Sequence, residues 1–206
     1  MLELCMPLNK ENLIAFEDKI AEIFNSGKIK SPVHLYSGNE DMIIEIFKEI
    51  GEHDWIFCSW RSHYQCLLKG VPENELLQAI LDGRSIALSF PRYKVFSSAI
   101  VAGQIPLALG TAYSLKNRKS LERVYCFLGD MTSETGVAQS AFTFAKNFDL
   151  PITFIIEDNN LSVCTNTRTT WGSNLLRYEK FENPKVASYK YTNKYPHAGA
   201  GKRVQF

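Results

Sequence analysis

The sequence lacks the features that mark several classes of protein. No window of about 18 residues is apolar and free of charge, so we expect no membrane-spanning segment. The chain does not start with a basic stretch followed by a long apolar run, which favours a cytoplasmic protein over a secreted one. The 23 basic and 22 acidic residues nearly cancel, so no global field attracts nucleic acid or an anionic membrane.

Cysteine is too sparse to form a structural framework. The five residues are Cys5, Cys58, Cys66, Cys126 and Cys164, an odd number without a Cys-x-x-Cys pair. We therefore expect reduced thiols that pack as small hydrophobic groups, and neither a zinc site nor a disulfide set.

The composition is that of an ordinary globular domain, with 206 residues, of which 45% are hydrophobic and 22% are charged. This excludes disorder, collagen and coiled coil as descriptions of the whole chain. Residues 1–172 are expected to form one domain. Over 173–206 basic residues outnumber acidic ones and tyrosines are interleaved, which indicates an extended arm that is solvated or contacts another subunit. Nucleic-acid binding by this arm is a weaker alternative.

Apolar periodicity predicts a helix over residues 10–26 and another after a capping box, in which Ser37 is the cap and Glu40 reaches back. Further helices are expected from residue 72 to 83 and from about 104 to 115. Residues 84–98 lack clean periodicity and contain Pro91, which favours a loop.

Residues 124–128 and 152–156 are apolar runs of strand length, separated by a helical pattern over 134–147. A strand, a helix and a strand over about thirty residues form a βαβ unit, whose parallel strands are buried on both faces. A further short strand is expected at residues 55–58. The fold class is therefore α/β, with a central, mostly parallel sheet flanked by helices.

Polar side chains follow the two strands of this unit. Asp130 comes after the first strand and Asn159 after the second. Ligands of parallel sheets bind beyond the carboxyl ends of the strands. A carboxylate and a carboxamide there could share Mg²⁺, with phosphate oxygens completing its shell. From spacing alone, an equally good alternative is that both residues only form turns and caps.

The segment GDMTSETGVAQSAFTFAKNFDLPITFIIEDNNLSVCT resembles the thiamine diphosphate motif. Within that superfamily it looks most like the alpha subunit of the decarboxylating component of 2-oxo acid dehydrogenases. VHLYSGNED, WRSH and IVAGQIPLALGTA resemble further segments of this family and occur in its order. Together the four segments cover most of residues 10–170. The resemblance implies a three-layer thiamine diphosphate-binding fold.

The resemblance also implies a ligand set for Mg²⁺ and the diphosphate. Asp130 would bind the metal through its carboxylate, Asn159 through its amide oxygen and Leu161 through its backbone carbonyl. The cofactor would also contact the start of the motif, at Gly129, Asp130, Met131 and Thr132. Met131 departs from the family, which has a second glycine there.

Other matching positions are assigned to the rest of the cofactor. Arg61 matches the arginine that clamps the diphosphate, and its planar fork suits two phosphate oxygens. Its alternative is a surface salt bridge. Trp60 stands where the family has a tyrosine. Ile100 and Val101 match the segment whose backbone meets the aminopyrimidine ring.

Two histidines are candidates for catalysis. His34 matches the family's active-site histidine and would transfer a proton or stabilise charge, unless it is only structural. His63 would either touch phosphate or brace Arg61. His197 would be a third candidate if the arm folds back over the site, although a plain turn is the simpler interpretation of its surroundings.

Proteins of this superfamily bind the cofactor between two domains, and this chain has room for only one. The resemblance therefore implies a beta-type subunit that carries the pyrimidine-binding domain and an activating glutamate, most simply in an α2β2 assembly. A small 2-oxo acid would be the substrate, and a lipoyl-bearing acyltransferase a possible acceptor of the acyl unit. Two alternatives are the N-terminal half of a split transketolase-like enzyme and a non-catalytic scaffold subunit.

Overall fold

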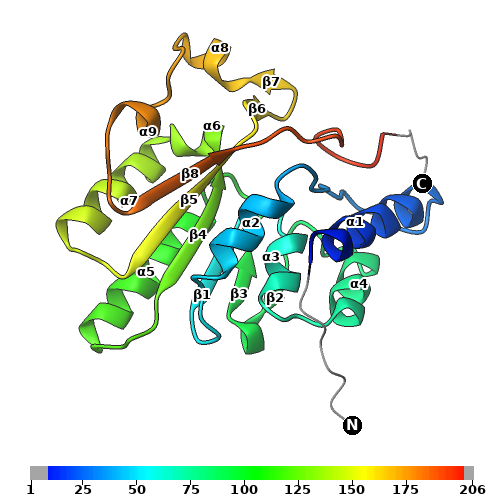
Figure 1. Ribbon diagram of the computed structural model, residues 1–206, viewed down its shortest axis with the longest axis horizontal. Helices are drawn as coiled ribbons and strands as arrows, with labels where there is room; N and C mark the ends of the chain where they lie inside the picture. Colours follow the sequence, from blue (N-terminus) through cyan, green and yellow to red (C-terminus); the bar gives the residue numbers. More distant parts are fainter. Residues whose placement is uncertain (1–8, 202–206) are drawn as a thin grey trace.

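The computed structural model describes residues 9–201 (Figure 1). Cys5, Lys202 and Arg203 lie outside the described residues. The helices are α1 (Lys10–Asn25), α2 (Glu40–Phe47), α3 (His63–Leu68), α4 (Glu73–Leu81), the 3₁₀ turn η1 (Pro91–Tyr93), α5 (Gln104–Asn117), α6 (Asp130–Ser133), α7 (Gly136–Asn147), α8 (Thr167–Trp171) and α9 (Arg177–Lys180). The strands are β1 (Trp55–Cys58), β2 (Ser89–Phe90), β3 (Val95–Ser97), β4 (Val124–Gly129), β5 (Ile152–Asp158), β6 (Leu161–Ser162), β7 (Thr165–Asn166) and β8 (Val186–Lys190).

Six of these strands form one sheet in the order β2-β3-β1-β4-β5-β8. All neighbours pair in parallel except β2 and β3, which are antiparallel. The pair β4–β5 runs in register from Val124 opposite Ile152 to Gly129 opposite Glu157. The predicted βαβ unit and the mostly parallel sheet are thus confirmed.

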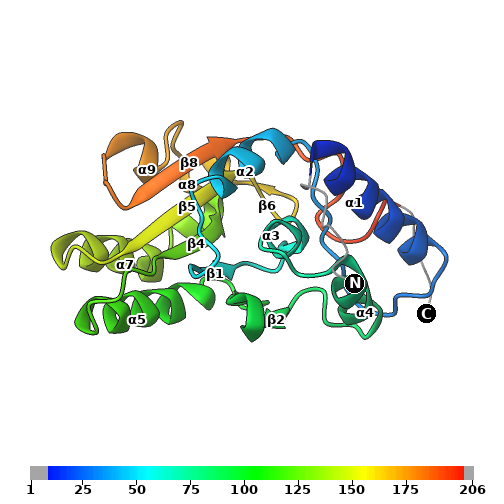
Figure 2. The ribbon, with the colours of Figure 1, turned by 60° about the horizontal axis from the view of Figure 1, so that its bottom comes forward.

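Helices cover both faces of the sheet (Figure 2). Along β4, Tyr125 and Phe127 join a core with α1, α2, α3 and α4, whereas Cys126 and Leu128 join a second core with α5 and α7. Alternate residues of a strand point to opposite faces, so a strand buried on both sides has an unbroken apolar run. The predicted three-layer α/β architecture is confirmed.

The predicted cap of α2 is wrong in one of its two parts. Asn39, not Ser37, occupies the N-cap position. Glu40 does reach back, and its carboxylate accepts a hydrogen bond from the backbone N–H of Gly38 at 2.9 Å. Ser37 instead donates its hydroxyl to Asn193, which is 156 residues away in sequence. A tertiary contact has therefore taken the group that the local pattern assigned to the helix.

The loop expected over residues 84–98 is also wrong in part. It contains β2, η1 and β3, and Val95 of β3 lies opposite Ile56 of β1. Pro91 begins the 3₁₀ turn between the two strands, where its fixed φ is tolerated. Strands of two and three residues are too short to show periodicity in the sequence.

The segment expected to be an arm contributes to the sheet. Strand β8 pairs with β5 and forms one edge. The chain then turns back across the end of the sheet toward α1 as a strap, which we define as residues 191–201 (Figure 1). The strap is fixed by hydrogen bonds from Gly199 N–H to the Val33 carbonyl and from Tyr195 Oη to Asp18. A role of this segment in contacting another subunit stays a prediction.

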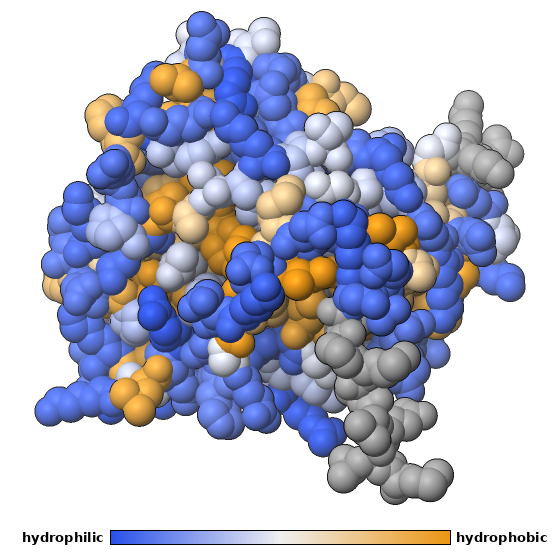
Figure 3. Space-filling model, in the orientation of Figure 1, coloured by the Kyte–Doolittle hydropathy of each residue, from blue (hydrophilic) through white to orange (hydrophobic). Residues whose placement is uncertain are grey.

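Within residues 9–201, Cys58, Cys66 and Cys126 are buried free thiols, as predicted, whereas Cys164 is a free thiol on the surface. No helix in this part of the chain is long and apolar enough to cross a membrane. The face drawn in Figure 3 is mostly hydrophilic, with apolar atoms gathered near its middle, over the sheet beside α2.

Two glycines allow a test of how firmly the strap is seated. Gly38 and Gly70 both have positive φ, at 80° and 91°. A Cβ at Gly38 would lie 2.3 Å from the carbonyl oxygen of Thr192 in the strap, whereas a Cβ at Gly70 would meet nothing within 4 Å. Gly70→Ala should cost about 1–2 kcal/mol through backbone strain alone. Gly38→Ala should cost about 2 kcal/mol more, because the strap must shift. Urea denaturation measures both, and equal losses would contradict a tightly seated strap.

Candidate functional site

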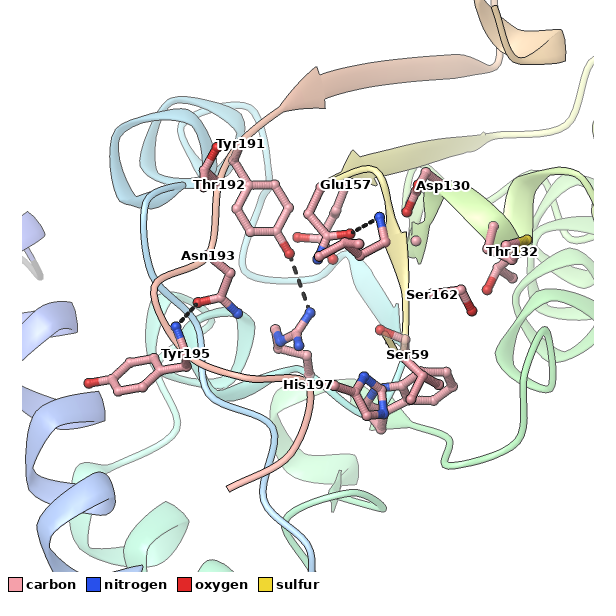
Figure 4. Close-up of a pocket in the computed structure, with 17 residues that line it drawn as sticks. Ser59, Asp130, Thr132, Glu157, Ser162, Tyr191, Thr192, Asn193, Tyr195 and His197 are labelled. Carbon is pink, nitrogen blue, oxygen red and sulfur yellow. Dashed lines mark hydrogen bonds between the residues drawn. The ribbon is translucent and has the colours of Figure 1, made fainter. Parts of the chain in front are cut away.

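A cavity opens at the edge of the sheet where the parallel strands end (Figure 4). Its walls come from four places: the segment after β1, the junction of β4 and α6, the end of β5 with β6, and the strap. The lining residues are Ser59, Trp60, Arg61, Gly129, Asp130, Met131, Thr132, Glu157, Asn159, Leu161, Ser162, Val163, Tyr191, Thr192, Asn193, Tyr195 and His197. The structure thus brings together eight residues that the sequence singled out for cofactor or metal. They are Trp60, Arg61, Gly129, Asp130, Met131, Thr132, Asn159 and Leu161.

Asp130 is the buried carboxylate of the cavity. It begins α6 directly after β4, and its Oδ2 has no hydrogen-bond partner among the described residues. Burial raises the pKa of Asp130 to about 6, while the Thr167 side chain and the backbone amides of Asp130 and Met131 lower it. An unpaired carboxylate oxygen in such a place is suited to a cation.

Asn159 and Leu161 share the turn that follows β5. Asn159 Oδ1 accepts a hydrogen bond from the Leu161 N–H at 3.0 Å, so part of the alternative, that Asn159 forms a turn, is observed. The oxygen has a second lone pair, and both residues line the cavity. Within residues 9–201, no three His, Cys, Asp or Glu side chains are grouped to hold a metal. A cation beside Asp130 would therefore depend on amide, hydroxyl or backbone oxygens.

Arg168 fixes the residues on either side of Asn159 in this turn, and the sequence analysis did not single it out. Its guanidinium donates to both carboxylate oxygens of Asp158, at 3.3 and 2.8 Å, and to Asn160 Oδ1 at 3.0 Å. It also bonds Glu179 Oε2 at 2.7 Å. Asn159 lies between two residues that Arg168 fixes, so the position of its side chain depends on this cluster.

Arg61 reaches the cavity from the segment after β1. Its guanidinium donates to the Tyr191 hydroxyl at 3.4 Å and lies over the Tyr36 ring, 5.8 Å from the centroid. Its Nε is buried and has no partner, and it forms no ion pair with any carboxylate of the described chain. The alternative of a surface salt bridge is thus not observed. The free donors of this cation are available to an anion.

Glu157 is a second buried carboxylate that the sequence analysis did not single out. Tyr36 donates to it at 2.8 and 2.9 Å, Tyr189 at 2.5 Å and Gln65 Nε2 at 3.3 Å. Burial raises the pKa of Glu157 to about 7, while the hydrogen bonds from Tyr189 and Tyr36 and the charge of Arg61 lower it. The Arg61 carbonyl lies 2.9 Å from the same Tyr36 hydroxyl, whose single proton is shared between Glu157 and this carbonyl, so the cluster fixes the backbone beneath Arg61.

The predicted histidines lie in different surroundings. His63 is buried, with its ring nitrogens bonded to Glu17 at 3.1 Å and to Ser85 at 2.9 Å, and it does not line the cavity. His34 lies behind the cavity wall, where it packs against the rings of Trp60 and His197. The strap does fold back, and it places His197 in the cavity wall.

Ile100 and Val101 do not line the cavity. Their exposed fractions are 72% and 54%, which is unusual for large apolar side chains. Met131, where the family has a glycine, accepts the Trp171 indole N–H on its sulfur at 3.1 Å. Its side chain therefore packs against α8 as well as lining the cavity.

The residues that line the cavity fit the Mg²⁺ ion and the diphosphate that the resemblance implies. A carboxylate oxygen of Asp130 and a guanidinium nitrogen of Arg61, both without a partner within residues 9–201, belong to residues that line one cavity at the carboxyl ends of parallel strands. A hard cation with a diphosphate would satisfy oxygen ligands and arginine together.

Comparison with known proteins decides the family. Residues 9–176 match the protein family described as "Dehydrogenase E1 component". The chain belongs to this family. It is 31% identical over 166 residues to pyruvate dehydrogenase E1 component subunit alpha of Porphyra purpurea, covering 72% of this chain and 48% of that protein. It is 31% identical over 182 residues to the subunit of the same name from Rickettsia typhi, covering 82% of this chain and 54% of that protein.

A third relative is the alpha subunit of acetoin:2,6-dichlorophenolindophenol oxidoreductase of Bacillus subtilis, at 27% identity over 161 residues. The alignment covers 73% of this chain and 48% of that protein. The chain thus spans about half the length of the curated relatives it matches. The resemblance to alpha subunits is confirmed at the level of the family.

Asp130→Asn tests the buried carboxylate. An acid whose pKa rises on folding, here from 3.8 to about 6, destabilises the fold as pH increases through that interval. Without Mg²⁺, the variant should be more stable than the parent by about 2–3 kcal/mol at pH 7.5 and equally stable near pH 4. Urea denaturation in EDTA at both pH values measures this. Asp149→Asn, at an exposed side chain, is the control and should change stability by less than about 0.5 kcal/mol at pH 7.5. A destabilised Asp130→Asn protein at pH 7.5 would contradict the assignment.

Proposed function

We propose that this chain is the cofactor-anchoring, alpha-type subunit of a thiamine diphosphate- and Mg²⁺-dependent enzyme that decarboxylates a 2-oxo acid and passes on the acyl or aldehyde unit. The observation that carries the proposal is the meeting of Asp130, Asn159 and Arg61 in one cavity, with buried polar atoms of Asp130 and Arg61 unpaired. Membership of the E1 family and the similarity to alpha subunits support it.

The cofactor, when bound, supplies the electron sink for breaking the bond to the departing carboxylate. The task of this chain is to bind and orient it. Asp130, Asn159 and the Leu161 carbonyl would hold Mg²⁺, and Arg61 would bind diphosphate oxygens. Backbone groups of Gly129, Met131 and Thr132, with the Trp60 indole, would complete the diphosphate site.

A beta-type partner is part of the proposal, most simply in an α2β2 assembly. The alpha subunits that this chain resembles are each named as one component of a larger enzyme. Ile100 and Val101 are exposed in the segment between β3 and α5, and they would meet an aminopyrimidine ring held by the partner. A lipoyl-bearing acyltransferase or a small acceptor would then take the acyl unit.

One purification tests the assembly. The tagged chain would be isolated from its own host in Mg²⁺ and examined by mass spectrometry for subunits and cofactor. We expect a beta-type subunit and thiamine diphosphate, and a lipoylated protein would indicate the dehydrogenase branch. A lone chain without cofactor would contradict the proposal and favour a scaffold role, and activity on ketose phosphates alone would favour the transketolase-like alternative.

Arg61→Lys tests the diphosphate site in the assembled complex. Lysine keeps the charge but loses the fork, so the affinity for thiamine diphosphate should fall by about 1–3 kcal/mol in calorimetric titrations with Mg²⁺. Arg92→Lys is the matched control, because Arg92 also lies over a tyrosine ring, at 5.9 Å, but outside the cavity. Equal affinities for the two variants would show that Arg61 does not touch phosphate.

A further inference from the structure

Two histidines from opposite ends of the chain meet at the cavity wall. The ring centroids of His34 and His197 are 4.6 Å apart, with an interplanar angle of 67°. His34 Nδ1 lies 2.5 Å from the backbone carbonyl oxygen of His197. His197 lines the cavity, as Figure 4 shows, whereas His34 is 8% exposed and is not among the lining residues.

The contact fixes the protonation state of His34. A carbonyl oxygen can only accept a hydrogen bond, so Nδ1 of His34 must carry the proton. Burial lowers the pKa of His34 to about 4, although the hydrogen bond to the His197 backbone raises it, and the charges of His197, Arg61 and His63 lower it further. The ring is therefore neutral at pH 7, with a proton on Nδ1 and a bare Nε2.

The backbone on both sides of His197 is attached to the segment that carries His34. Gly199 N–H donates to the Val33 carbonyl at 2.9 Å, and His34 and Gly199 form an isolated parallel β-bridge. Asn193 Nδ2 donates to the Leu35 carbonyl at 2.9 Å. With the bond from His34 between these two, three hydrogen bonds hold the strap in a fixed place and leave the His197 ring directed at the cavity.

We propose, resting on the proposed function, that His197 is the histidine that hydrogen-bonds the substrate and that His34 is the residue that positions it. The cavity then has a cofactor-binding part, with Arg61 for the diphosphate and Asp130 for the metal, and a separate polar part at the strap. In its neutral form the imidazole of His197 offers one N–H and one bare nitrogen. It suits the carbonyl oxygen or the carboxylate of a small oxo acid.

Nitrogen NMR on the ligand-free chain tests the positioning. Long-range ¹H–¹⁵N spectra distinguish the two imidazole tautomers, and His34 should carry its proton on Nδ1. His197→Asn keeps the backbone carbonyl, so the tautomer of His34 should be unchanged in that variant. A proton on Nε2 of His34 in the parent protein would overturn the proposal.

Kinetics of the alpha–beta complex test the division of roles, with pyruvate as substrate and 2,6-dichlorophenolindophenol as electron acceptor. His197→Asn should lower kcat about 100-fold, the scale of one positioned acid–base group. His34→Asn keeps a donor near Nδ1 and should stay within about fivefold of the parent, whereas His34→Leu should lose at least tenfold. His53→Asn, at an exposed histidine, is the control and should be unchanged.

The outcomes separate this proposal from the broader one. Full activity of His197→Asn, or an equal loss in His34→Asn, would overturn the division of roles while leaving the cofactor assignment intact. A parent complex that binds no thiamine diphosphate would contradict the proposed function and the substrate role of His197 together. The tautomer would still decide whether His34 holds the strap.

Discussion

The parallel pairing of β4 with β5 is the constraint on which the site depends. Because both strands end at the same edge of the sheet, the turn at Asp130 and the turn at Asn159 open into one space. β1 and β8 flank this pair and deliver Arg61 and Tyr191 to the same edge. The segments that follow these four parallel strands are distant in sequence, and they meet at this edge because all four strands run in the same direction.

This arrangement leaves polar atoms buried and unpaired. Asp130 Oδ2 and Arg61 Nε each lack a partner in the described part of the chain. Each such group typically costs about 1–3 kcal/mol. The two apolar cores, one on each face of the sheet, offset that cost.

The sequence predicted the parts of the structure that repeat over several residues. Strands such as Val124–Gly129 and helices such as Lys10–Asn25 have a long apolar run or a clear helical period. β3 and β8 have neither, because one is three residues long and the other is an edge strand with few buried residues. Ser37 shows a different limit, since Asn193 takes the hydroxyl that the local pattern assigned to a cap.

The same limits apply to the site. The segments that resemble the family predicted Asp130, Asn159 and Arg61, because few residue types can bind Mg²⁺ or a diphosphate. The contacts of Glu157, Arg168 and Tyr191 are with residues that the fold brings close. Their spacing along the chain therefore does not predict a role in the site. His34 was expected near the reacting centre, whereas the structure leaves it out of the cavity lining and bonds it to the His197 carbonyl, a contact across 163 residues that local sequence does not specify.

The strap has a consequence for how the protein is made. Three walls of the cavity come from residues 59–163, but the fourth comes from residues 191–197. A ribosome-bound chain that has folded its sheet through β5 therefore has Asp130 and Arg61 in place while one side of the site is still open. Synthesis of residues 191–197 completes the cavity, so a chain that stops before them would keep Asp130 and Arg61 exposed to bulk water.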